Sequence, residues 1–205
     1  MLEGIIKSPS GKNLKVIKEF SPEIEVYNSN YVYNKFDSGE YAFNEYINKS
    51  AGDDKCRGDG VTYIIHERID NISKLIAYYT ISASTVHFAD RYDFEDDDIP
   101  ENEKRERYSP ISAFSINMFA VNKEYQDCIY EGYLISDLIL KEVILNLYEM
   151  SINVIGAKII ILCSVTDAID FYKRNGFKEL TEDYTLFDKP NLIDNKPMYL
   201  TMHEY

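Results

Sequence analysis

The sequence contains no tryptophan, and its cysteines are few and form no pattern. The three cysteines, Cys56, Cys128 and Cys163, are an odd number and include no CxxC pair. This spacing argues against a disulfide framework and against a zinc ribbon. The three histidines also stand far apart in the sequence, so the sequence predicts no metal site.

Long apolar runs are missing as well. No uninterrupted apolar stretch approaches the roughly 20 residues that a membrane-spanning helix needs. The first residues, MLEGIIKSPSGKN, lack the apolar core of a secretory signal peptide. We therefore expect a cytoplasmic protein that binds no membrane.

Positive charge is scarce overall. The chain has 22 Lys and Arg residues against 35 Asp and Glu residues, and its net charge is −13. A field of this sign repels phosphate backbones and favours cationic substrates, so nucleic-acid binding is disfavoured. The first 18 residues are the exception, because one acid, Glu3, stands among four lysines, Lys7, Lys12, Lys15 and Lys18. They leave a local basic patch open.

What is present is enough for a folded core. The 205 residues are 45% hydrophobic and include 18 tyrosines. A chain of this size and composition predicts one globular domain over residues 1–205, with residues 1–35 as an N-terminal strand extension. Tyrosine combines apolar area with a polar tip, so some of these rings are expected to line a cleft or an interface.

The first half of the chain reads as strands around short helical and loop segments. Residues 1–35 alternate apolar and polar side chains and predict one or two strands. A short amphipathic helix is expected over Tyr41–Lys49, and a glycine-rich, charged loop over Ala51–Gly60. Val61–Glu67 and Lys74–Val86 predict two strands, and the turn-prone residues between them indicate a hairpin.

The second half predicts a strand–helix–strand unit. The polar segment Asp90–Arg107 is expected to be a surface loop, followed by a strand over Ile111–Val121. Gly132–Met150 has the pattern of a largely buried helix, and Lys158–Val165 that of a buried strand. Pro197–His203 is expected to close the sheet as a last strand. This order predicts a mixed α/β (α+β) fold.

The segment Ala168–Phe177, AIDFYKRNGF, is the most informative stretch. It predicts a short helix after a buried strand, with Ser164 or Thr166 as its cap. Gly176 suits the left-handed residue that ends a helix. Tyr172 on such a helix, next to the strand's carboxyl end, is a candidate proton donor. The alternative is that its aromatic rings only fill the core.

The motifs and their order resemble those of the GNAT superfamily of N-acetyltransferases. FAVNKEYQ at Phe119–Gln126, GAKIII at Gly156–Ile161 and FYKRNGF at Phe171–Phe177 carry the resemblance. YYTIS at Tyr78–Ser82 and PMYL at Pro197–Leu200 have counterparts in the branch that contains acetylating toxins and their relatives. The resemblance implies a central mixed sheet flanked by helices, and acetyl transfer from acetyl-CoA to a primary amine.

The resemblance also implies a set of site residues. Tyr172 would be the catalytic general acid that protonates the departing CoA thiolate. Backbone amides around Phe119, Ala120 and Val121 would bond the pantetheine arm and polarise the thioester carbonyl. The remaining cofactor-binding residues would lie around the pyrophosphate and at the start of the helix at Gly132. They are Gln126, Asp127, Cys128, Ile129, Tyr130, Glu131, Gly132 and Asp167.

The pyrophosphate-binding segment departs from the family's glycine-rich pattern. Of its glycines only Gly132 remains, and Asp127 and Glu131 place negative charge beside an anionic ligand. Small residues normally let the backbone approach a phosphate closely. The sequence therefore predicts weaker binding or a different course for this segment.

Several alternatives stay open. The acceptor is expected to be a small cationic amine or an amine of a peptide or protein, and aminoacyl-tRNA is an alternative. A GNAT-like binding module without catalysis is another. Monomer and homodimer are both compatible with the sequence. The general base is not identified, and the candidates are Glu40, His66, Glu67 and His87.

Overall fold

The computed structural model divides into two compact units. It describes residues 2–8, 11–28, 36–69, 72–90, 107–180, 184–185 and 195–203. Unit 1 comprises Met1–Ser82 and Ile116–Tyr148, and unit 2 comprises Ala83–Ser115 and Glu149–Tyr205. Three elements contribute residues to both units, namely β5 (Ile72–Asp90), β6 (Arg107–Val121) and α4 (Ile135–Asn153).

The larger sheet has the strand order β10-β12-β9-β6-β5-β4-β3, and β11 pairs with β5. Strands β6 and β9 are neighbours although α4 lies between them in sequence, which is the predicted strand–helix–strand crossover. The expected mixed α+β class is confirmed. The other strands are β3 (Glu23–Val26), β4 (Val61–Ile69), β9 (Ile159–Val165), β10 (Lys178–Glu179), β11 (Tyr184–Thr185) and β12 (Asn195–Thr201).

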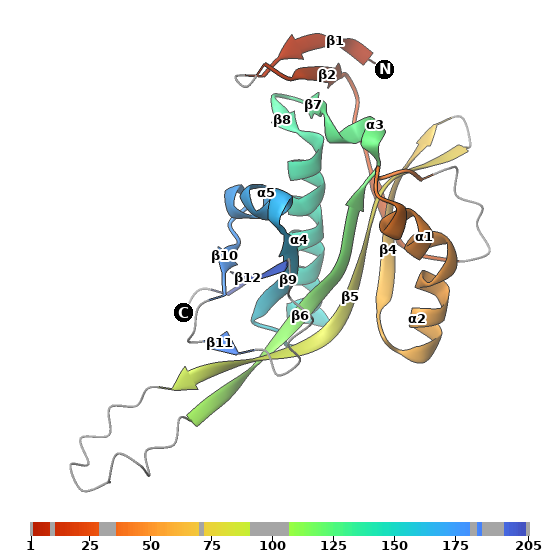
Figure 1. Ribbon diagram of the computed structural model, residues 1–205. Coiled ribbons are helices and arrows are strands. Elements are labelled where there is room, and N and C mark those ends of the chain that lie inside the picture. The colour runs from red at the N-terminus through yellow and green to blue at the C-terminus, as the bar shows by residue number, and fades with distance from the viewer. Residues whose placement is uncertain are drawn as a thin grey trace, which may run out of the picture. The chain divides into compact units, whose positions relative to one another are not determined.

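A second sheet in unit 1 contains the N-terminus. Its order is β1-β2-β7-β8, and its strands are β1 (Leu2–Lys7), β2 (Asn13–Ile17), β7 (Cys128–Tyr130) and β8 (Tyr133–Leu134). Strands β1 and β2 form an antiparallel hairpin, and β2 runs parallel to β7 (Figure 1). The described part of the first 35 residues, 2–8 and 11–28, thus contains three strands, β1, β2 and β3, rather than the expected one or two.

Two helices cover one side of β4 in unit 1. Helix α1 (Tyr41–Lys49) has the predicted bounds, and β4 and β5 form the predicted antiparallel hairpin. Helix α2 (Ala51–Arg57) replaces the loop expected over Ala51–Gly60. Acidic residues in its first turn and basic residues in its last turn stabilise this helix through its dipole. Gly58, with a left-handed φ of 79°, ends the helix.

The core of unit 1 forms between these helices and the sheet. It consists of Phe36, Ile47, Ala51, Ile64, Leu75, Tyr78 and Ala120. The hydroxyl of Tyr78 donates a hydrogen bond to the carbonyl of Phe43, at 2.7 Å. The phenol is therefore buried without losing its polar partner.

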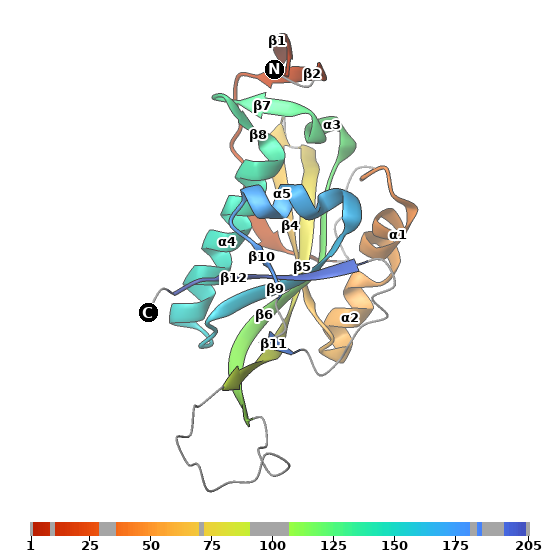
Figure 2. The ribbon, with the colours of Figure 1, turned by 60° about the vertical axis from the view of Figure 1, so that its left-hand side comes forward.

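Unit 2 is built around β9 and β12. These strands pair antiparallel along their whole length, from Ile159 opposite Thr201 to Val165 opposite Asn195. The last strand therefore has the predicted place, and it begins two residues earlier than Pro197. Val86, Ala113, Ile159 and Ile161 form one buried hydrophobic cluster of this unit. Figure 2 shows β9, β10 and β12 together with α5 (Ile169–Arg174).

A surface loop was expected over Asp90–Arg107. Asp90 ends β5 and Arg107 begins β6, and the residues between them, 91–106, lie outside the described part of the chain. Among the helices that the structure describes, none combines the length and the apolar character required to span a bilayer.

Candidate functional site

The segment after β9 presents Tyr172 on a short helix of unit 2. The chain leaves β9 through one 3-10 turn, Thr166–Ala168, and continues as α5. The exposed Asp167 lies in this first turn. Gly176 follows the helix with a left-handed φ of 92°, as predicted. A residue with a side chain is rarely found at such a φ, so this glycine fixes where the helix ends.

The predicted side-chain cap is not formed. Val165 and Ala168 occupy the two N-cap positions, and neither supplies a capping hydrogen bond. The Ser164 hydroxyl donates instead to the carbonyl of Val165, at 2.9 Å. The prediction of Ser164 or Thr166 as a cap is therefore wrong, because the 3-10 turn moves the start of the α-helix to Ile169.

The ring of Tyr172 packs against the rings of Phe171, which precedes it in the sequence, and Phe177, which follows it. The Tyr172 side chain is 8% exposed. The ring meets Phe171 and Phe177 edge to face, with centroids 5.0 Å and 5.6 Å apart. Burial raises the pKa of the Tyr172 hydroxyl, so the phenol is protonated at neutral pH. The ring thus fills core space as the simpler interpretation expects, and its hydroxyl keeps the proton that a general acid needs.

In unit 1, the end of β6 is oriented by its hydrogen bond to β5. The amide of Asn122 donates to the carbonyl of Ile76, at 2.7 Å. Successive N–H groups of an extended strand point to opposite edges. The amides of Phe119 and Val121 are therefore directed to the edge of β6 that faces away from β5. Ala120, between them, is buried in the core.

Gln126 stabilises this end of β6 from the following turn. Its side-chain amide donates to the carbonyls of Val121, at 2.8 Å, and Ser38, at 2.9 Å. It lies in the short helix α3 (Lys123–Gln126), which the Asn122 side chain caps by accepting from the amide of Glu124. The Gln126 side chain thus connects β6 to the chain before α1.

The segment that the resemblance assigns to pyrophosphate binding has regular structure. Residues Cys128–Tyr130 form β7, which pairs with β2 on one side and β8 on the other. Glu131 and Gly132 make the turn to β8 with φ values of 50° and 86°. Two consecutive positive φ angles are typical of a tight hairpin turn. The helix expected to begin at Gly132 begins instead at Ile135.

Long-range pairing therefore corrects two local expectations. Residues 128–130 form a strand instead of part of the phosphate-binding loop that the resemblance implies, which is the different course that the sequence left open, because β2 supplies a partner strand that lies far away in sequence. The helix start moves because β8 uses Tyr133 and Leu134 first. The roles proposed for Gln126–Gly132 in binding acetyl-CoA remain predictions.

The N-terminal hairpin brings lysines to this segment. The Lys12 ammonium forms an ion pair with the Asp127 carboxylate, at 2.7 Å, and the Lys15 amide donates to the Asp127 carbonyl, at 2.9 Å. Lys15 stands opposite Cys128 in the β2–β7 register. The negative charge of Asp127 is thus compensated by Lys12 in the folded chain. The cluster of four lysines was the only signal of this in the sequence.

Cys128 and Tyr130 do not add reactive groups here. The Cys128 thiol is 2% exposed and donates to the carbonyl of Glu124, at 3.0 Å. Burial raises the pKa of this thiol, which keeps it as an unreactive neutral group. The neighbouring Glu131 raises the pKa of the Tyr130 hydroxyl. Ile129 is buried in the same strand.

The candidate bases differ in how strongly they are engaged. Glu67 accepts from the amide of Ser21, at 3.2 Å, and from the hydroxyl of Tyr125, at 3.5 Å. Glu40 is exposed at the start of α1. His87 is half-buried on β5, and His66 is buried on β4. The candidate binding residues Phe119–Gly132 belong to unit 1, whereas Asp167 and Tyr172 belong to unit 2.

Comparison with known proteins shows which solved structures have a similar fold. No family model matches the sequence, and no curated protein matches it either. Solved structures do match. A bacterial toxin shares 19% identity at a TM-score of 0.64, over 89% of this chain and 91% of that one. The complex AtaTR bound with acetyl-CoA shares 18% identity at a TM-score of 0.61, over 88% and 94%.

A third match is AtaT complexed with acetyl-methionyl-tRNAfMet, with 20% identity, a TM-score of 0.57, and coverage of 82% and 94%. The chain is thus similar to these toxins along most of its length. At these identities the likeness establishes the fold. It is the GNAT fold that the sequence motifs predicted.

Proposed function

We propose that this protein is an N-acetyltransferase that transfers the acetyl group of acetyl-CoA to a primary amine. The observation that carries the proposal is the near full-length likeness to AtaTR, a complex whose structure contains acetyl-CoA. Two features of the chain support it independently of that likeness. They are the protonated Tyr172 after β9 and the amides of Phe119 and Val121, which lie on the edge of β6 away from β5.

In the proposed reaction a neutral amine attacks the thioester carbonyl. The new C–N bond forms as the C–S bond breaks, and the amides near Phe119 and Val121 stabilise the charge on the carbonyl oxygen. Tyr172 gives its proton to the CoA sulfur and recovers it from solvent. The amine loses its extra proton to a base or to water.

For the nucleotide part, the proposal uses the N-terminus of α4 and the adjacent second sheet. The unpaired amides of a helix's first turn and its dipole favour phosphate. Helix α4 begins at Ile135, directly after β8. Lys12 and Lys15 add positive charge beside Asp127. This arrangement replaces the glycine-rich loop that the sequence lacks.

The acceptor amine is proposed from charge. A net charge of −13 attracts cations. We therefore expect a small cationic amine or a lysine side chain of a peptide or protein. Aminoacyl-tRNA is the second candidate, and the observation that favours it is the complex of AtaT with acetyl-methionyl-tRNAfMet. The lysines of the β1–β2 hairpin would then contact the RNA.

A two-stage experiment tests the function. Calorimetry first measures binding of acetyl-CoA to the full chain. A thiol-release assay then follows transfer to polyamines, aminoglycosides, a lysine peptide and methionyl-tRNA. Binding followed by release with one of these amines supports an acetyltransferase and identifies its acceptor class. No binding at millimolar acetyl-CoA would overturn the proposal and favour a GNAT-like module without catalysis.

A further inference from the structure

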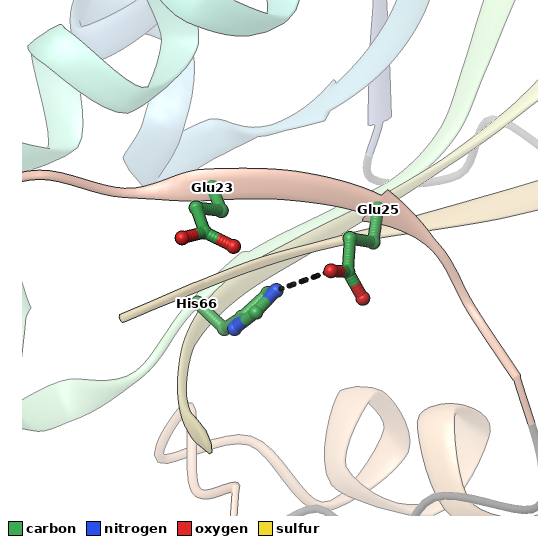
Figure 3. Close-up of side chains that lie close together, drawn as sticks. All are labelled: Glu23, Glu25 and His66. Carbon is green, nitrogen blue, oxygen red and sulfur yellow. Dashed lines mark ion pairs between the residues drawn. The ribbon is translucent and has the colours of Figure 1, made fainter. Parts of the chain in front are cut away.

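Three potential metal ligands converge where β3 pairs with β4 in unit 1. Strand β3 is the end strand of the sheet order, and its Glu23 lies directly opposite His66 of β4. Glu25 is two residues further along β3, so its side chain leaves the same face as that of Glu23. The ligand atoms of the three side chains all lie within 4.8 Å of one another (Figure 3).

His66 is the unusual member of this group. Its side chain is almost fully buried, with 1% of the residue exposed. Its Nδ1 lies 2.8 Å from the hydroxyl of Ser73, whereas its Nε2 has no hydrogen-bond partner. Nε2 points toward the Glu25 carboxylate, with 3.6 Å between the two atoms (Figure 3). Buried polar atoms are normally satisfied, so this atom calls for an explanation.

Arg68 is a partner for the two carboxylates but not for the imidazole of His66. Its guanidinium contacts Glu25 at 2.8 Å and Glu23 at 3.5 Å. These ion pairs are exposed, and charged side chains on an end strand also discourage pairing with other chains. Neither role uses Nε2 of His66. A cation between the imidazole and the two carboxylates would satisfy this nitrogen and both acids together.

We propose that Glu23, Glu25 and His66 bind a divalent transition-metal ion of the zinc type. Imidazole nitrogen and carboxylate oxygen are ligands that zinc accepts at about 2.0–2.2 Å. In the metal-bound form, Nδ1–H of His66 would donate its hydrogen bond to the Ser73 hydroxyl, which would leave the lone pair of Nε2 for the metal. Water completes the coordination.

The geometry needs only small side-chain movements. Tetrahedral ligands at zinc are separated by about 3.3 Å, which is shorter than the 4.8 Å limit within which these atoms lie. The Glu23 and Glu25 side chains are 53% and 39% exposed, so both can rotate inward. Arg68 releases one oxygen of Glu25. The bound ion would connect the end strand β3 to β4, and this role is independent of the proposed acetyl transfer.

Metal titration of the full chain tests the site. The protein is prepared without an affinity tag, treated with a chelator, and carries Cys56→Ser and Cys163→Ser, because exposed free thiols are able to bind zinc. Calorimetry with zinc chloride is expected to give saturable binding of one ion per chain. Cobalt(II) is expected to give visible absorption without a thiolate charge-transfer band, and zinc is expected to raise the melting temperature.

Variants assign the ligands. His66→Gln and Glu25→Gln are each expected to weaken zinc binding by more than about 10-fold, the scale of losing even an outer partner of a metal ligand. Glu25→Gln changes a half-exposed side chain, so it keeps the test valid if His66→Gln does not fold. Glu142→Gln, on the exposed face of α4, is the matched control and is expected to bind zinc normally.

Arg68→Gln sharpens the test because it predicts a gain. Removing the competing guanidinium is expected to tighten zinc binding several-fold while leaving all three ligands in place. Absence of saturable binding in the parent protein would overturn the proposal. Equal affinities in the parent, His66→Gln and Glu25→Gln would also overturn it, since the ion would then bind elsewhere.

Discussion

The two parts of the candidate site are built in different ways. The segment Thr166–Gly176, which carries Tyr172, is built from consecutive local elements: a 3-10 turn, a helix and a terminal glycine follow directly after β9. The segment Gln126–Gly132 is folded by a distant partner, because β7 becomes a strand beside β2. One part is local and the other depends on residues at the N-terminus.

This difference suggests why the segment around Tyr172 keeps the family's motif, whereas the segment Gln126–Gly132 has lost most of its glycines. A locally determined segment must keep its residue pattern, and FYKRNGF does so. A segment supported by another strand can lose the usual glycines, and in the proposed function the β2–β7 pairing, Lys12 and Lys15 would replace part of their role. Variants of each part should therefore fail in different measurements.

Tyr172→Phe is expected to have the largest effect. It removes the proposed proton donor but keeps the ring packed between Phe171 and Phe177. Turnover should fall by about 10²–10⁴-fold, the usual contribution of a general acid, while acetyl-CoA affinity is unchanged. Thiol release and calorimetry measure the two quantities.

Tyr79→Phe is the control for Tyr172→Phe. It removes another buried phenol hydroxyl, which accepts a hydrogen bond from Asn146 at 2.6 Å. This change is expected to lower stability by about 1 kcal/mol without a comparable loss of turnover. Full turnover in Tyr172→Phe would remove this residue from the acid role and leave it as core packing.

Sequence patterns predicted the local parts of the fold well. Helix Tyr41–Lys49, the hairpin of β4 and β5, strand β9 and the glycine after α5 all follow from periodicity and turn chemistry. The motifs on these elements, together with their order, carried the resemblance to the GNAT fold, and the chain is similar to solved toxin structures.

The errors occurred where structure depends on distant residues or weak local signals. Ile129 and Tyr130 favour a strand, but a run of three residues gives no period to recognise without its partner β2, so β7 and the later start of α4 were missed. Helix α2 was missed because Gly52 and the charges of Ala51–Gly60 suggest a loop. The group at Glu23, Glu25 and His66 was also missed, since residues far apart in sequence become neighbours only through the β3–β4 register.

The second comparison of the two parts uses charge. Lys12→Glu combined with Lys15→Glu reverses the positive charge beside Asp127. Acetyl-CoA affinity is expected to fall by about 10-fold at low salt and by less at high salt, because exposed charges are screened. Calorimetry at two ionic strengths measures this. Lys55→Glu, on α2, is the control, and an equal loss in that variant would show that only net charge matters.

The smallest expected effects concern the turn between β7 and β8. Gly132 has a φ of 86°, so Gly132→Ala is expected to destabilise the protein by about 1 kcal/mol. Glu131 holds a φ of 50° with a side chain, so Glu131→Gly is expected to stabilise it by up to about 1 kcal/mol. Chemical denaturation measures both changes.

Gly156→Ala is the control, because the added methyl group meets open space and no positive φ is involved. Equal stabilities of Gly132→Ala and Gly156→Ala would contradict the prediction that the turn requires a glycine at its positive φ. The structure of this turn would then have to be explained by the pairing of β7 with β2 alone.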